Sequence, residues 1–141
     1  MTKDEPQQLL RTRTMNIEEK ARQAQVEQTV LAAARAAHEV NSVYSATIGD
    51  TPSPAWHDLT PAQRQGVLAG AQHALDGGTP EASHALWLQT RAAEGWVYGP
   101  VKSFTERTSP CMVPYAELPE AQRRKDVLFQ SVVRAVAEAL R

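Results

Sequence analysis

Aromatic and cationic side chains gather in one stretch of this chain. Trp96 and Tyr98 are close neighbours, and Arg91, Lys102 and Arg107 lie around them. Trp and Tyr rings offer flat apolar faces with a polar tip, and Arg and Lys donate hydrogen bonds to anionic oxygens. Such residues can stack a planar ring and hold a charged group, which are the two demands of a nucleotide. The sequence therefore predicts a nucleotide-like small molecule as the ligand.

Three residues from other segments could complete this site. Tyr115 would close it from an opposing segment, and His38 and Trp56 would contribute from the first half of the chain. The alternative is that the tryptophans belong to the hydrophobic core and not to a ligand site, because Trp is usually highly buried. In that case the apolar stripes on the first and last helices favour a protein–protein interaction module or a homodimer.

Catalytic and metal-binding chemistry has no comparable pattern. The single cysteine, Cys111, stands in an apolar run in which a thiol is usually inert. No phosphate-binding glycine loop, nucleophile elbow or zinc-ligand spacing is present. We therefore expect a protein that is not an enzyme and that has no catalytic residue, metal or cofactor. The histidines, which form no close i, i+4 pair, are His38, His57, His73 and His84.

Charge and composition narrow the class of partner. Lys and Arg number 15 against 16 Asp and Glu, giving a net charge of −1, which argues against a nucleic-acid backbone as partner. Hydrophobic residues make up 42% of the chain, as in globular proteins. No apolar run approaches the ~20 residues of a membrane span, and the polar N-terminus lacks the apolar stretch of a signal peptide. These features predict a cytoplasmic protein without a membrane partner.

Four helices are expected to position the candidate site. Asn16 is a plausible N-cap for the first helix, Thr60–Pro61 and Thr79–Pro80 open the second and third, and Pro119–Glu120 opens the last. Gln63 completes a capping-box pattern with Thr60. The expected helices extend over residues 16–48, 60–76, 79–94 and 119–141.

A minimal β-hairpin is expected between the third and fourth helices. Its strands would be Gly95–Pro100 and Cys111–Tyr115, which are rich in aromatic and β-branched residues. The fold class is thus mainly α, with about four helices and one two-stranded hairpin. Residues 1–15 are predicted to be a mobile tail, and residues 16–141 a single domain.

Three short motifs follow one another in the second half of the chain: Gly95–Trp96–Val97–Tyr98–Gly99–Pro100, Val113–Pro114–Tyr115 and Leu118–Pro119–Glu120. Their order and spacing resemble the RyR domain, the repeat named after the ryanodine receptor channels. The resemblance covers roughly residues 34–138. Three departures from the family pattern are present. His84–Ala85–Leu86–Trp87 lacks a usual acid, Arg91 replaces a usual lysine, and Ser109–Pro110 replaces a usual His-Pro pair.

The resemblance implies a binding or regulatory module rather than an enzyme. A paired repeat of the channels has been associated with adenine nucleotide. Stand-alone RyR domains of bacteria and phages are suspected of recognising nucleotide-derived signals. A phage or prophage protein of this type would act as a sensor of such a signal, or as a sponge that sequesters it.

Overall fold

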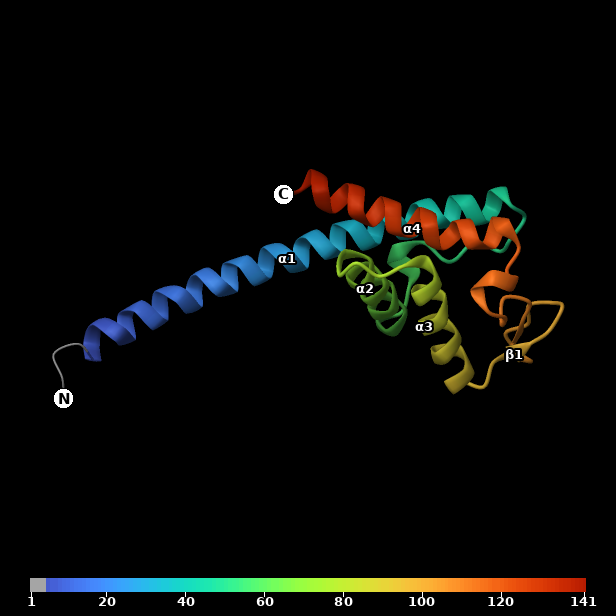
Figure 1. Cartoon of the computed structure of the whole chain (residues 1–141), viewed down its shortest axis with the longest axis horizontal. Helices are drawn as coiled ribbons and strands as arrows, with labels where there is room; N and C mark the ends of the chain where they lie inside the picture. The colour runs from blue at the N-terminus through green and yellow to red at the C-terminus, as the bar shows by residue number, and fades with distance from the viewer. Residues whose placement is uncertain (1–4) are drawn as a thin grey trace.

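Four helices and two short parallel strands form the chain in the computed structural model, which describes residues 5–141 and the side chains of residues 16–141. The longest helix extends well beyond the other elements, which gather around its C-terminal half (Figure 1). The elements in chain order are α1 (Glu5–Thr47), η1 (Trp56–Asp58), α2 (Pro61–Leu75), α3 (Pro80–Ala93), β1 (Val97–Tyr98), β2 (Thr108–Ser109), η2 (Tyr115–Glu117) and α4 (Glu120–Ala139).

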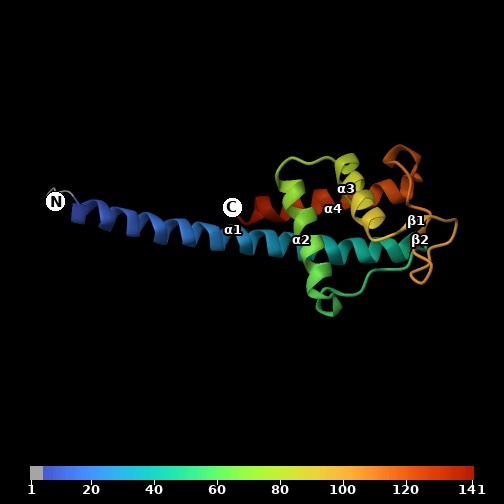
Figure 2. The same cartoon turned by 90° about the horizontal axis from the view of Figure 1, so that it is seen from below.

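The core forms where α4 lies antiparallel against the C-terminal half of α1, with α2 crossing the same face (Figures 1 and 2). Most of its buried members are small, and Ala34, Ala37 and Val133 have no solvent exposure. Alanine side chains allow helix axes to approach closely, so the packing depends on surface fit rather than on large side chains. The buried cluster consists of Val30, Ala33, Ala34, Ala37, Ala71, Ala74 and Val133.

The expected starts of α2, α3 and α4 are confirmed. The Thr60 hydroxyl accepts from the Gln63 backbone N–H, and the Gln63 side chain accepts from the Thr60 N–H, which completes the capping box. Thr79 caps α3 in the same way through the Ala82 N–H. Since four helices account for most of the described residues, the mainly α fold class is correct.

Among the described residues, no helix is both long and apolar enough to cross a bilayer.

The expected start of the first helix at Asn16 is wrong. α1 begins at Glu5, and Asn16 is an exposed residue in its interior. The intervening residues are mostly good helix formers, and Pro6 falls in the first turn, where its missing N–H costs no hydrogen bond. The N-capping preference of Asn16 does not outweigh them. Of the predicted tail, residues 1–4 lie outside the described residues.

The short sheet is parallel, so the expected hairpin is wrong in its second strand and its direction. Val97 pairs with Thr108 and Tyr98 with Ser109, whereas Cys111–Tyr115 forms a turn and the start of η2. An antiparallel bridge joins Ser103 to Thr108, so the chain reverses direction twice between β1 and β2. Two reversals restore the original direction, which a single hairpin turn cannot do.

A polar contact fastens the end of α1 to the start of α4. The Tyr44 hydroxyl donates to the Ala121 carbonyl at 2.9 Å, and Lys125 and Gln122 both bind the Asp50 carboxylate. Burial raises the pKa of Asp50, but the hydrogen bonds from Lys125 and Gln122 outweigh it and leave the pKa below its usual value. This contact fixes where α4 begins along α1.

The alanine-lined packing can be tested with one substitution at two neighbouring positions of α1. Ala34→Leu would force a larger side chain into a site with no free surface, so we expect a loss of about 1–3 kcal/mol in the free energy of unfolding. Ala32→Leu is the matched control, because Ala32 is exposed on the same helix. Urea denaturation measures both, and equal stability of the two variants would contradict the packing described.

Candidate functional site

The C-terminal end of α3 determines the position of Trp96. Gly95 adopts φ +89°, a left-handed conformation in which glycine carries no steric cost. The Trp96 N–H donates to the Arg91 carbonyl at 3.0 Å, and the Gly95 N–H donates to the Ala92 carbonyl at 3.0 Å. These two bonds form a Schellman motif, which ends the helix and turns the chain back over its last turn. Trp96 is thereby placed beside Arg91.

One face of α3 carries His84, Trp87 and Arg91 at helical spacing. The His84 and Trp87 rings stack at 5.4 Å between centroids, and the Arg91 guanidinium lies 5.9 Å from the Trp87 ring and 5.4 Å from the Trp96 ring. The edge-on contact between Trp96 and Phe104, at 5.7 Å, extends the series into the loop after β1. We call this series the aromatic–cation ladder. It comprises Tyr115, His84, Trp87, Arg91, Trp96, Phe104 and Lys102.

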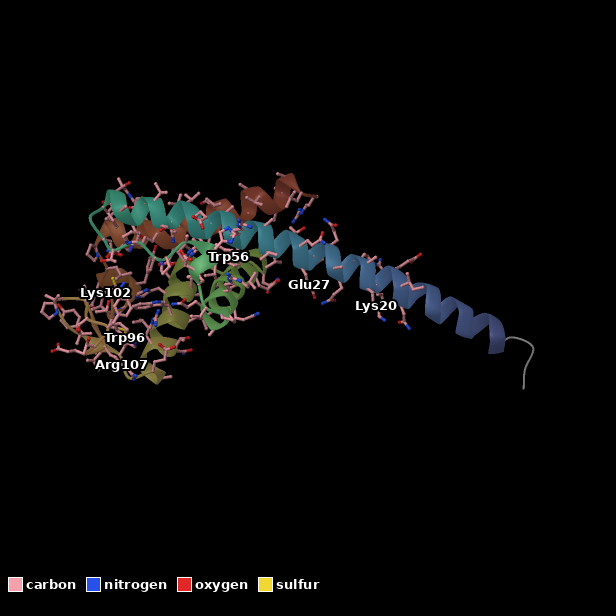
Figure 3. All side chains as sticks on the ribbon, turned by 180° about the vertical axis from the view of Figure 1, so that it is seen from behind. Lys20, Glu27, Trp56, Trp96, Lys102 and Arg107 are labelled. Carbon is pink, nitrogen blue, oxygen red and sulfur yellow. The ribbon has the colours of Figure 1, made fainter. Side chains whose placement is uncertain are left out.

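The loop end of the ladder is open to solvent. Lys102 places its ammonium group 5.2 Å from the Phe104 ring, and Phe104 is 69% exposed. Arg107 donates to the Glu94 carbonyl and adopts φ +54°, a backbone conformation that few residues other than glycine populate. Figure 3 shows Trp96, Lys102 and Arg107 together at this end of the molecule. Two cations and an exposed ring thus share one surface.

The inner end of the ladder contains a carboxylate. The His84 Nε2–H donates to the Val113 carbonyl at 2.7 Å, and the Tyr115 ring lies 6.2 Å from the His84 ring. Burial raises the pKa of Asp126 to about 6, and the charges of His84 and Lys125 lower it only in part. Burial also raises the pKa of the Tyr115 hydroxyl, and the charges of Glu81 and then Asp126 raise it further. A carboxyl group with a raised pKa beside aromatic side chains is a candidate functional group.

His38 and Trp56 belong to a second cluster. Figure 3 shows Trp56 beside α1 and away from Trp96 and Lys102 of the ladder. The His38 and Trp56 rings meet edge-on at 6.1 Å, and His38 Nε2 donates to the Pro54 carbonyl at 2.7 Å. The Glu39 carboxylate accepts from the Trp56 backbone N–H at 2.9 Å, and Arg64 donates to the Trp56 carbonyl at 3.1 Å. With its side chain buried, Trp56 anchors the loop between α1 and α2.

The predicted site residues are therefore divided between two places. Arg91, Trp96, Lys102, Arg107 and Tyr115 line or adjoin the ladder, and Tyr98 lies in β1 with 59% of its surface exposed. Trp96 as a whole residue is only 9% exposed, and Arg91 and Phe104 contact its ring. The exposed rings of Phe104 and Tyr98 are thus more accessible for stacking than Trp96 itself.

Sequence reasoning missed three members of this region. The spacing of His84, Trp87 and Arg91 by three and four residues could have placed His84 beside Trp87. Phe104 could have been noticed as the only aromatic side chain in the polar loop between β1 and β2. Nothing in the sequence marks Asp126, because its proximity to His84 depends on how α4 packs. No group of three or more metal-ligating side chains occurs within the described part of the chain.

The raised pKa of Asp126 predicts how stability depends on pH. The folded state binds this proton more tightly than the unfolded state, so stability falls as the pH rises from about 4 to about 6. Asp126→Asn removes the ionisation. We expect the variant to gain about 1–3 kcal/mol over the wild type at about pH 7, with the gain vanishing near pH 4. Thermal unfolding across this range measures it, and a gain independent of pH would contradict the assignment.

Comparison with protein-family models places the sequence that forms this site in a known family. The model of the RyR domain matches residues 62–137, which is more than half of the chain. The match extends from α2 into α4 and includes every residue of the ladder, whereas His38 and Trp56 lie outside it. It supports a ligand-binding or interaction module. The chain belongs to the RyR domain family.

Proposed function

We propose that this domain binds a nucleotide or a nucleotide-derived signal at the open end of the aromatic–cation ladder and does not transform it. The observation that carries the proposal is the exposed Phe104 ring with the Lys102 ammonium beside it. The ring offers a face to a base, and the ammonium a charge to a phosphate. Such a protein acts as a sensor of its ligand or as a sponge for it.

Besides Lys102, two arginines that both bind Glu94 support recognition of an anion. Arg107 is held in place by the Glu94 carbonyl, and Arg91 by the Glu94 carboxylate at 3.1 Å. Both guanidinium groups retain further N–H donors, since each has five and spends few on these contacts. Stacking contributes ~1–3 kcal/mol per base, and each charge-assisted hydrogen bond ~1.5–3 kcal/mol before ordering costs. Micromolar affinity is therefore within reach.

The surroundings of Cys111 support binding without catalysis. Burial raises the pKa of its thiol, which disfavours the thiolate that a nucleophile needs. Its backbone N–H donates to the Ser109 hydroxyl, a contact that fixes the turn after β2. Cys111 thus stabilises the turn after β2 and is poorly suited to act as a nucleophile on a ligand.

We propose that the protein acts in the cytoplasm.

A second candidate function is a protein–protein interaction module. It is favoured by the large apolar residues that remain exposed on α1, among them Ile17 and Val43, at 69% and 70%. The two functions involve different faces of the molecule, so one chain can carry both. A ligand panel tests the first, and the oligomeric state tests the second.

Binding can be measured by titrating the protein with linear and cyclic adenine and guanine nucleotides and with ADP-ribose, reading melting temperature and tryptophan fluorescence. A ligand at about 100 times its Kd adds ~2.7 kcal/mol of stability. Lys102→Glu should weaken binding of the best ligand about tenfold or more, because it reverses the charge that faces the phosphate. Lys102 is exposed, so the variant should fold normally.

Arg22→Glu is the matched control, since it makes the same reversal on the projecting part of α1 and should leave the affinity unchanged. If no compound of the panel changes the melting temperature or the tryptophan fluorescence, nucleotide recognition is contradicted. Equal affinities of the Lys102→Glu and wild-type proteins would contradict the location of the site.

A further inference from the structure

The N-terminal half of α1 extends from the domain without packing against another element (Figures 1 and 2). Every residue from Asn16 to Gln28 is exposed. A single helix in water is held only by its own hydrogen bonds, and such segments are marginally stable. Most helical stability in proteins comes from packing of one face. This half of α1 is therefore a helix that lacks a packing partner within its own chain.

A stripe of four small or apolar residues and one glutamine runs along the exposed segment. Ile17, Ala21, Ala24, Gln28 and Leu31 repeat at spacings of four, three, four and three, which places them on one face. The face turned toward α4 and α2 carries Val30, Ala34 and Ala37 instead. At 100° per residue the two stripes lie about 140° apart around the helix. The first stripe thus faces away from the core.

An open hollow of about 560 Å³ continues this stripe toward the domain. Leu31 belongs to both, and it is 45% exposed. The hollow lies beside the loop between α1 and α2, because Arg35 binds His57 of that loop at 3.1 Å. Stripe and hollow form one continuous surface. The hollow is lined by Gln28, Leu31, Ala32, Arg35, Ala36 and Glu39.

We propose that two copies of this chain pair through this stripe, with their α1 helices antiparallel and Ala21 of each copy facing Ala24 of the other. Alanines at the centre let the two helices approach closely. A second copy is the fitting partner because the stripe is complementary to itself, as a two-fold interface requires. The proposal is independent of nucleotide binding, since it uses none of the residues of the ladder.

Lys20 and Glu27 complement each other in the antiparallel arrangement. They lie on the same flank of the stripe, seven residues apart. In an antiparallel pair that flank meets its own copy, so Lys20 of one chain lies near Glu27 of the other, twice by symmetry. In a parallel pair the flank meets the opposite one, where Gln25 and Ala32 lie opposite Lys20 and Glu27 and pair with neither.

The α1–α2 loop limits the length of this contact. Arg35, Glu39 and Ser42 bind that loop through the His57 ring, the Trp56 N–H and the Ser53 carbonyl, so the loop covers this face of α1 beyond Leu31. With Ala21 opposite Ala24, residue 14 of the second copy lies level with Leu31. The contact therefore runs along about 27 Å of each helix at 1.5 Å per residue.

Sedimentation equilibrium of the full chain, over protein concentrations from about 1 to 100 µM, tests the proposal. We expect a dimer with a Kd within this range. Ala24→Glu would place charges at the centre of the interface and should yield a monomer. Val26→Glu is the matched control, because Val26 is equally accessible on the opposite side of the helix and its loss should leave the dimer intact. Circular dichroism confirms that both variants remain helical.

Charge reversal tests the direction of the helices. Lys20→Glu and Glu27→Lys should each weaken the dimer about threefold to tenfold, because like charges would then face each other. The double variant Lys20→Glu/Glu27→Lys should restore wild-type affinity. A monomer at about 100 µM, or loss of the dimer in Val26→Glu, would overturn the proposed stripe. A double variant no tighter than the single variants would overturn the antiparallel register.

Discussion

Close contact between α1 and α4 through small side chains is the constraint on which the rest of the structure depends. Ala34, Ala37 and Val133 meet with no exposed surface, and α2 adds Ala71 and Ala74 on the same side. The contact does not extend to the N-terminal half of α1, where every residue from Asn16 to Gln28 is exposed. It also fixes the position of α4, whose N-terminal turns carry Asp126 against His84 of α3. The ladder and the projecting helix are thus both consequences of one packing arrangement.

The candidate site combines a rigid support with an open surface. The Schellman motif and the covered Trp96 ring hold the base of the ladder, while Phe104 and Lys102 remain exposed at its end. At the inner end a carboxyl group is retained although burial disfavours its charge. Functional sites commonly hold such groups at a cost in stability. These features agree with the ligand-binding or interaction module that the family match supports.

Local sequence patterns predicted the helices well and the tertiary contacts poorly. The caps at Thr60 and Thr79 act through residues three positions away, so their effect can be seen in the sequence. The parallel sheet could not be predicted, because its direction depends on two chain reversals. Of the predicted site residues, Arg91, Trp96, Lys102 and Tyr115 lie in one series of contacts, whereas His38 and Trp56 contact each other elsewhere. The sequence identifies Trp56 and Trp96 as aromatic residues but does not show where they lie. Only the packing of α1 and α3 shows that they belong to separate clusters.

The central claim is that ligand recognition occurs at the ladder, whereas Trp56 serves the fold. The three tryptophans provide three indole N–H resonances, which report on Trp56, Trp87 and Trp96 separately. A ¹H–¹⁵N spectrum with and without the best ligand of the nucleotide panel tests the claim most directly. The predicted result is a shift of the Trp87 and Trp96 resonances with Trp56 unchanged. A spectrum in which no indole moves, or in which Trp56 alone moves, would contradict it.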